Sequence, residues 1–183
     1  PIKEEYLLSG LLEPTNQSYA IAKITGIQMC DSYRKQYSCN FISAMPTNLY
    51  GPNDNFDLKS SHVIPALLRK FHEAKKNDLK TVTLWGDGSP LREFLHVDDC
   101  ASACLFLMKE FNDYGPVNVG TGSDISILAF AMLIAPKTHS KVEIKLDLSN
   151  PNVTPKKQLA VSKITNLGRK DTIYLQNGIQ SVD

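Results

Sequence analysis

A tyrosine and a lysine four residues apart are the first side chains whose types and spacing suit a reaction. Tyr19 and Lys23 fall in a segment that we expect to be helical from about residue 15 to residue 36. Residues four apart share a helix face, so the phenol and the ammonium can converge on one ligand, where the cation favours the ionised phenol. Such a pair suits carbonyl reduction, in which an acid protonates oxygen as hydride reaches carbon. The same spacing also fits an ordinary solvated helix face.

A stiff, polar loop follows the next expected strand, which covers about residues 41–45. The loop reads Pro46-Thr47-Asn48-Leu49-Tyr50-Gly51-Pro52. In doubly wound folds, ligands bind at the carboxyl ends of parallel strands, which is where this loop would lie. Its first four residues are therefore candidates for ligand contact. An ordinary turn is the alternative, because proline, asparagine and glycine are common turn residues.

Side chains suited to acid–base work and to anion binding come next. His62 stands near the start of the following expected helix, and an unperturbed histidine exchanges protons near neutral pH. Arg92 follows the turn Gly86–Pro90, where a guanidinium can bind a diphosphate through paired hydrogen bonds. Trp85 ends a strand beside that turn and can offer a ring face to a base or sugar. The alternatives are a structural or exposed histidine, a surface ion pair for Arg92 and a core position for Trp85.

The elements that must position these side chains alternate between strands and helices. The second expected helix has Pro65 in its first turn and an apolar face formed by Ile64, Leu67, Leu68 and Phe71. The expected strands cover about residues 41–45, 81–85, 93–97, 117–119 and 142–146, and the later helices about 100–110 and 126–134. The expected N-terminal caps are Ser60 or Ser61, Asp98 with Asp99, and Asp124 or Ser126. This alternation predicts an α/β layer structure with parallel pairing, and residues from 150 onward stay unassigned.

Composition narrows the class of protein. The 183 residues include 20 Lys and Arg against 19 Asp and Glu, a net charge of +1, and 42% hydrophobic residues. These values exclude a disordered tail and leave no bulk charge for nucleic-acid binding. No apolar run approaches the ~18–20 residues that span a bilayer, and the first residues lack the basic and apolar blocks of a signal peptide. We therefore expect a cytoplasmic protein that binds neither nucleic acid nor membrane.

Several conspicuous side chains are expected to be structural or solvated. The four cysteines, Cys30, Cys39, Cys100 and Cys104, form no Cys-x-x-Cys pair. They lack further metal ligands nearby, so we expect buried, reduced thiols and no metal site. His96 lies in a strand-like run and is expected to be packed. Lys156 and Lys157 follow a proline-containing loop and are expected to be solvated charges.

Four segments together occur in the order and spacing of one protein family. They are Tyr19-x-x-x-Lys23, Pro46 to Pro52, Ser61 to Leu67, and Trp85 to Asp99. The chain resembles the GDP-L-fucose synthases, which are extended short-chain dehydrogenase/reductases acting on nucleotide sugars. The resemblance is strong over about residues 13–126 and thins afterwards. The Tyr-Lys pair is common to the superfamily, whereas the second and third segments point to this member.

The resemblance implies a fold and a division into domains. We expect the carboxyl-side part of a Rossmann-like, doubly wound parallel sheet with a smaller α/β lobe for the substrate. Residues 1–60 would belong to the NADP-binding domain and residues 61–183 mainly to the substrate lobe. A segment near residues 93–122 would return to the NADP-binding domain. Members of the family are typically homodimers with the Tyr19–Lys23 helix at the interface.

The resemblance also implies a reaction. The family converts GDP-4-keto-6-deoxy-D-mannose to GDP-L-fucose with NADPH, inverting C3 and C5 by proton exchange and then reducing the 4-keto group. Carried over by position, Tyr19 protonates the C4 oxygen, while Lys23 favours its ionised form and holds the nicotinamide ribose. His62 acts in the epimerisation and, like Tyr19 and Lys23, borders the cofactor. The cofactor wall is Pro46, Thr47, Asn48 and Leu49. The substrate contacts are Trp85, Arg92, Lys157 and Lys70, the last at a position where the family commonly has arginine.

Two parts of the family pattern are missing from the sequence. No Gly-x-x-Gly-x-x-Gly motif for a cofactor pyrophosphate occurs, and the catalytic Ser and Cys that accompany His62 would precede Pro1. We therefore expect the chain to be the carboxyl-side portion of the enzyme and inactive by itself. Two alternatives remain: another nucleotide-sugar epimerase or dehydratase, and a non-catalytic, nucleotide-sensing relative of the same fold.

Overall fold

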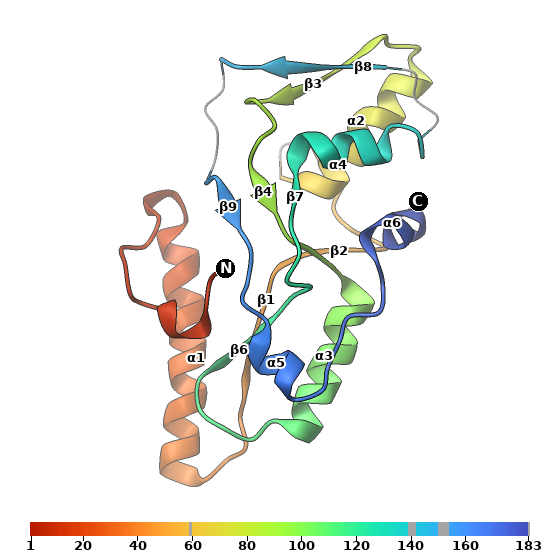
Figure 1. The fold of residues 1–183 in the computed structure, drawn as a ribbon. Helices are drawn as coiled ribbons and strands as arrows, with labels where there is room; N and C mark the ends of the chain where they lie inside the picture. The colour runs from red at the N-terminus through yellow and green to blue at the C-terminus, as the bar shows by residue number, and fades with distance from the viewer. Residues whose placement is uncertain (59, 139–141, 150–153, 183) are drawn as a thin grey trace.

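The computed structural model describes residues 1–58, 60–138, 142–149 and 154–182. The described chain is elongated. A long helix and one pair of strands lie at one end, and two packed helices with another pair of strands lie at the other (Figure 1). Extended segments connect the two ends and carry the short strands between them.

Parallel pairs dominate among the strands. β1 (Ser43–Pro46) pairs with β6 (Pro116–Val119), β2 (Asn48–Tyr50) with β5 (Phe94–His96), and β3 (Thr81–Trp85) with β8 (Glu143–Asp147), all in parallel. β4 (Leu91–Arg92) is the central strand of three, parallel to β9 (Lys156–Lys157) and antiparallel to β7 (Ile125–Ser126). The predicted α/β arrangement with parallel pairing is confirmed. The segment after residue 46 is not wholly loop, however, because β2 pairs there with β5.

The first long helix, α1 (Gln17–Tyr37), confirms the prediction for this segment and lies at the end of the molecule that holds β1 and β6 (Figure 1). Short 3-10 turns, η1 (Glu4–Tyr6) and η2 (Pro14–Asn16), precede it. It stops at Ser38, whose left-handed backbone directs its N–H to the Arg34 carbonyl. All residues of α1 are described and none is buried. Within the described chain, no helix has the length and apolar content to cross a membrane.

The second long helix, α2 (Val63–Lys76), buries the predicted apolar face. Ile64, Leu67, Leu68 and Phe71 are all buried. The predicted serine cap is wrong, because His62 takes the N-cap position and makes no side-chain capping bond. Pro65 at the third helical position has no N–H group. One of the donors that a capping serine would bind is therefore absent, and capping by serine would stabilise the helix less.

The remaining helices are α3 (Val97–Glu110), α4 (Ile127–Ile134), α5 (Ser162–Asn166), α6 (Leu175–Gly178) and the 3-10 turn η3 (Ile179–Ser181). The predicted aspartate cap of α3 is wrong. His96 is the N-cap, and its Nδ1 accepts the N–H of Asp98 at 3.2 Å. Asp98 and Asp99 therefore fall inside the first helical turn. Ser126 caps α4 as predicted and accepts the N–H of Ala129.

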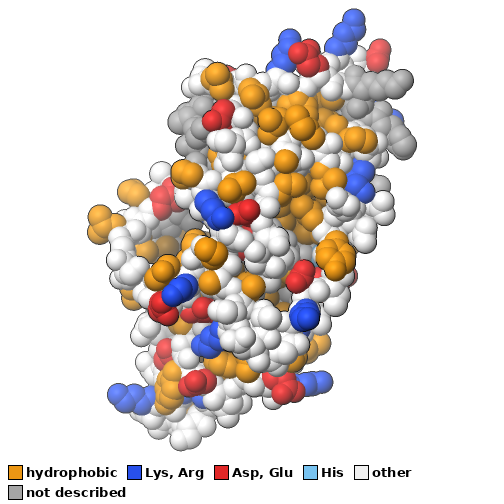
Figure 2. Space-filling view, viewed as in Figure 1, with side chains coloured by type: hydrophobic (Ala, Val, Ile, Leu, Met, Phe, Trp, Pro, Cys, Tyr) orange, Lys and Arg blue, Asp and Glu red, His pale blue; other side chains and the backbone are white. Residues whose placement is uncertain are grey.

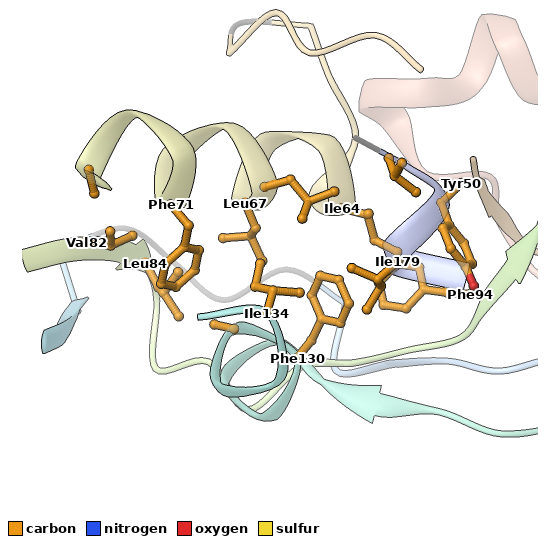
Figure 3. Packing of buried hydrophobic residues seen from close by; sticks show 14 residues of the cluster. Tyr50, Ile64, Leu67, Phe71, Val82, Leu84, Phe94, Phe130, Ile134 and Ile179 are labelled. Carbon is orange, nitrogen blue, oxygen red and sulfur yellow. The ribbon is translucent and has the colours of Figure 1, made fainter. Parts of the chain in front are cut away.

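Buried hydrophobic residues form two clusters. The larger one fills the space between α2, β3 and α4, with Phe71, Leu84 and Phe130 among its members (Figure 3). The smaller one joins α3, β6 and α5, with Leu107 and Val117 as buried members. On the face seen in Figure 2, hydrophobic side chains gather over α4, while basic side chains lie scattered among acidic ones. Each end of the molecule therefore has its own core.

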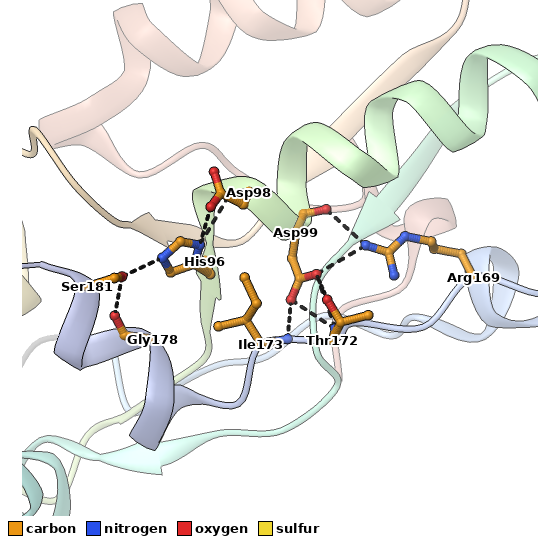
Figure 4. A network of polar contacts seen from close by, with 8 residues as sticks. All are labelled: His96, Asp98, Asp99, Arg169, Thr172, Ile173, Gly178 and Ser181. Atoms are coloured by element: carbon orange, nitrogen blue, oxygen red, sulfur yellow. Dashed lines mark hydrogen bonds and ion pairs between the residues drawn. The ribbon is translucent and has the colours of Figure 1, made fainter.

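The tail of the chain is anchored to the start of α3 by a buried carboxylate (Figure 4). Asp99 accepts the backbone N–H groups of Thr172 and Ile173 and the Thr172 hydroxyl, and Arg169 lies 3.3 Å away. Burial alone would raise the pKa of Asp99, but these hydrogen bonds outweigh it and lower that pKa below its ordinary value. Ser181 lies 2.9 Å from His96 Nε2, which ties η3 to the same place.

Candidate functional site

A cavity of about 750 Å³ collects most of the predicted site residues. It lies where the start of α1, the β1–β2 segment, the residue before α2, and β9 approach one another. The predicted residues that line it are Tyr19, Pro46, Thr47, Asn48, Leu49, His62 and Lys157. Segments far apart in the sequence thus supply a phenol, an imidazole, an ammonium and a polar wall to one space.

The tyrosine–lysine pair lies at the α1 side of this cavity. Tyr19 is 61% exposed, and the Lys23 ammonium lies 5.4 Å from the centre of its ring, as expected for residues one helical turn apart. Tyr19 lines the cavity directly, whereas Lys23 does not. Among the described residues, neither side chain is engaged in a hydrogen bond or ion pair, so both remain available to a ligand.

The opposite wall is held from behind by backbone and side-chain bonds. The N–H of Thr47 donates to the Val119 carbonyl at 3.0 Å, which continues the β1–β6 pairing. The Thr47 hydroxyl and the Asn48 amide both donate to the Glu93 carbonyl, at 3.3 and 2.8 Å. These side chains therefore fix the wall to the residue before β5, while Pro46, Thr47, Asn48 and Leu49 all line the cavity.

His62 reaches the cavity because it directly precedes α2. Its backbone is extended, and its carbonyl accepts the N–H of Ala66 in the first turn. The side chain is exposed and lines the cavity. The buried face of α2 thus sets the position of the imidazole, while its ring stays open to a ligand.

A second, buried tyrosine belongs to the same wall. Tyr50 is 1% exposed, and its ring meets that of His96 edge-on with centroids 5.3 Å apart. Burial, with a smaller effect from Asp99, raises the pKa of Tyr50 to about 12. Tyr50 therefore stays protonated near neutral pH, and its side chain is almost wholly buried although the residue lines the cavity. Of the two tyrosines at the cavity, only Tyr19 has an exposed side chain.

Three predicted substrate contacts lie outside this cavity. Trp85 is 70% exposed at the end of β3, with the Lys70 ammonium 5.2 Å from its ring centre. Lys70 also donates to the Thr83 carbonyl, and burial lowers its pKa. Arg92 is 6% exposed and lines a second cavity of about 490 Å³.

The Arg92 guanidinium is engaged with the backbone. Its Nη1 donates to the Leu91 and Thr154 carbonyls at 2.7 and 2.8 Å, and burial lowers its pKa. The predicted paired bonds to a diphosphate would need the other nitrogen atoms or a rotation of the side chain. Arg92 and the 750 Å³ cavity are therefore not brought together.

Sequence reasoning missed an ion pair whose lysine lines the 750 Å³ cavity. Lys156 lines the cavity and forms a 2.9 Å ion pair with Asp124, so it is not the simple solvated charge expected. Asp54 and Thr154 line the cavity as well. No local pattern could have found this pair, because Asp124 and Lys156 meet only through the β7–β4–β9 sheet.

The cysteines take no part in the cavity. Cys30, Cys39, Cys100 and Cys104 are all free; the first three are partly buried and the last is exposed, so the expected full burial is wrong. Burial, with smaller effects from Cys104, raises the pKa of Cys100 to about 11. Within the described ranges, no three His, Cys, Asp or Glu side chains gather as a metal site would require.

Comparisons with known proteins agree with the geometry. Residues 1–120 match the NAD dependent epimerase/dehydratase family. The chain is 50% identical to GDP-L-fucose synthase of Sinorhizobium fredii, across 98% of this chain and 57% of that protein. It is 47% identical to GDP-L-fucose synthase of Escherichia coli, across 99% and 59%. The chain therefore spans less than two thirds of the curated relatives it matches, and the sequence resemblance is confirmed.

A solved structure has the same fold. A GDP-L-fucose synthetase from Naegleria fowleri bound to NADP superposes with a TM-score of 0.94 at 29% identity. The match covers 100% of this chain and 59% of that one. The prediction of a Rossmann-like α/β fold is thereby confirmed.

Proposed function

This chain belongs to the NAD dependent epimerase/dehydratase family, and we propose that the protein carrying it is a GDP-L-fucose synthase. Its reaction would convert GDP-4-keto-6-deoxy-D-mannose to GDP-L-fucose with NADPH. The observation that carries the proposal is the single cavity lined by Tyr19, the residue 46–49 wall, His62 and Lys157. The relatives at 47–50% identity support the choice of substrate.

The residues present fit a nicotinamide cofactor. The cavity of about 750 Å³ combines an exposed phenol on one side with a wall whose polar groups are already paired behind it. Pro46 and Leu49 suit the face of a flat ring, and Lys23 suits the hydroxyls of a ribose. When bound, NADPH supplies the hydride of the reduction.

Tyr19 is the acid in this proposal. Its hydroxyl donates a proton to the C4 oxygen as negative charge develops there, and the nearby Lys23 ammonium stabilises the phenolate left behind. Tyr50 cannot substitute, because it is buried and its pKa is raised. Lys23 therefore acts through Tyr19 as well as on the cofactor.

His62 is assigned to the proton exchange at C3 and C5. An exposed imidazole at the cavity can take a proton from a carbon next to the ketone and return one from solvent. Lys157, across the cavity, would neutralise part of the substrate's diphosphate. Lys70, Trp85 and Arg92 are proposed to contact the GDP portion, with Trp85 offering an exposed ring.

The proposal includes the domain division and a homodimer. Residues 1–60 and about 93–122 would form part of the cofactor domain, which is supported by the β1–β6 pairing. The rest would form the substrate lobe. A second copy would cover α1, which leaves Ile21, Met29 and Tyr33 exposed. Burying such side chains in an interface lowers the free energy of association.

Product analysis in D₂O tests the proposed function. The protein, NADPH and GDP-4-keto-6-deoxy-D-mannose should give GDP-L-fucose in proportion to the NADPH oxidised, with deuterium at C3 and C5. Turnover of a keto-sugar linked to another nucleotide would favour a different epimerase or dehydratase. Binding without any turnover would favour a nucleotide-sensing relative. The 183-residue chain alone should not oxidise NADPH, because it has no glycine-rich turn to position the cofactor.

A further inference from the structure

A fully buried glutamate between β4 and β5 has an unusual set of partners. Glu93 is 0% exposed. Its Oε1 accepts the N–H of Gly122 at 2.7 Å and the Thr121 hydroxyl at 3.5 Å, and its Oε2 accepts the N–H of Leu159 at 2.6 Å. Within the described residues, no cation lies at ion-pair distance from this carboxylate. The buried charge is therefore stabilised by uncharged donors from two other segments.

The backbone of Glu93 is bonded to two walls of the 750 Å³ cavity. Its carbonyl accepts the Thr47 hydroxyl and the Asn48 amide, which belong to the proposed cofactor wall. Its N–H donates to the Lys157 carbonyl at 3.2 Å, and its carboxylate holds Leu159 two residues further on. Both Lys157 and Leu159 line the cavity. One residue thus joins walls that are more than 100 residues apart in sequence.

The glycine-containing loop after β6 is packed closely on the same carboxylate. A Cβ added to Gly120 would lie 2.3 Å from Glu93 Oε1, far inside van der Waals contact. Gly120 has no positive φ, so the space taken by Glu93, and not backbone strain, is what requires glycine there. The carboxylate is therefore in close contact with this loop at Gly120 as well as hydrogen-bonded to it at Gly122.

We propose that Glu93 is the positioning residue that fixes the distance between the cofactor wall at residues 46–49 and the substrate wall at residues 157–159. The inference rests on the proposed function for the meaning of the two walls. The hydride donor and the keto-sugar must meet within a fraction of an ångström, and a misplacement of about 1 Å can lower a rate about 100-fold. Glu93 touches neither ligand and acts through the residues it holds.

Asp99 provides a matched comparison. It is likewise buried, at 2% exposure, and likewise accepts two backbone N–H groups and a threonine hydroxyl. Unlike Glu93, it also has a cation, Arg169, at 3.3 Å. Its partners Thr172 and Ile173 belong to the tail, and none of these residues lines the 750 Å³ cavity. Substitution at Asp99 therefore reports the cost of disturbing a buried carboxylate without moving the cavity walls.

Hydrogen exchange in the whole protein tests the positioning role without reference to any substrate. In Glu93→Gln, the side-chain NH₂ must face one backbone donor, so the Gly122 or Leu159 amide should exchange at least 10-fold faster while β3 amides keep their rates. Gly120→Ala should accelerate the same amides. Glu93→Asp, which keeps the charge on a shorter side chain, serves if Glu93→Gln does not fold. Unchanged exchange at Gly122 and Leu159 in the folded variants would overturn the proposal.

A kinetic comparison then tests whether the positioning matters for the reaction. Glu93→Gln should lower kcat at saturating NADPH and sugar at least 10-fold, with KM for either ligand changed less than threefold. Asp99→Asn should leave kcat of the folded protein unchanged. Equal losses in the two variants would overturn the role of Glu93, because general destabilisation would explain both. If the unmodified protein shows no turnover, the proposed function fails, while the exchange result still decides whether Glu93 fixes the walls.

Discussion

The two helices that border the cavity differ in how they are held. α2 follows His62 and buries six of its residues, including Phe71 at 0% exposure, in the larger core. α1 carries Tyr19, is half as long again, and buries none of its described residues. The position of His62 is thus set by packing within this chain. Tyr19, by contrast, lies on a helix that buries none of its residues within this chain. The two side chains proposed to react are therefore held with very different amounts of packing.

The largest expected effect is on the α1 side. Tyr19→Phe should lower kcat for NADPH oxidation by about 10²–10⁴-fold, because it removes the proton donor and keeps the ring. The free energy of unfolding should change by less than about 0.5 kcal/mol, since the side chain is exposed. Stopped-flow absorbance and denaturant titration measure the two quantities. Tyr33→Phe, on the same helix, is the control, and a similar loss in that variant would refute the assignment.

On the α2 side we expect a large loss of stability and no change in kcat. Phe71→Ala should lower the free energy of unfolding by about 3–5 kcal/mol, because it leaves a cavity in the core between α2, β3 and α4. The kcat per folded molecule should be unchanged. Phe41→Ala, at a ring that is 48% exposed, is the matched control and should cost far less. A small effect at Phe71 would show that this core can collapse around the gap.

The buried carboxylate of Asp99 extends the comparison to α3, which, like α2, is held by contacts within this chain. Asp99→Asn should cost about 1–3 kcal/mol at pH 7, since the hydrogen bonds to the tail lose a charged acceptor. The pKa of Asp99 is lowered in the folded protein, so its contribution is present above the unfolded pKa near 4 and is lost as pH falls through the folded value. Urea titrations at pH 7 and at successively lower pH should therefore show the two proteins converging in acid.

The smallest expected effect tests whether the second copy proposed to cover α1 packs against Gly26. A Cβ at Gly26 would meet nothing within 4 Å in this chain. Gly26→Ala should therefore stabilise the protein by about 0.4–1 kcal/mol through helix propensity and reduced unfolded-state entropy. Thermal unfolding of both proteins provides the measurement. A loss of stability would instead mean that another surface packs closely against this part of α1.

The contrast between the two helices also explains what the sequence could predict. The periodic apolar residues of α2 and the alternating strand over residues 81–85 follow from local rules, and both were placed correctly. The Tyr19–Lys23 spacing placed both side chains on one face for the same reason. The prediction for these elements needed no knowledge of distant segments.

The failures involve partners that are distant in sequence. β2 forms because β5 offers a parallel neighbour, and the polar loop residues gave no sign of this. His96 rather than an aspartate caps α3, which begins at Val97, and Asp99 bonds instead to the tail at Thr172. The sequence did not indicate the role of Glu93 either, because the N–H groups that its carboxylate accepts belong to two loops far apart in the chain.

The most direct test measures the epimerisation and the reduction in one variant. The whole protein with Tyr19→Phe is incubated in D₂O with NADPH and the keto-sugar, and the recovered sugar is examined by mass spectrometry and NMR. We predict that deuterium still enters at C3 and C5 through His62, while NADPH oxidation falls at least 100-fold. Undiminished NADPH oxidation in this variant would contradict the assignment of Tyr19 as the proton donor in the cavity.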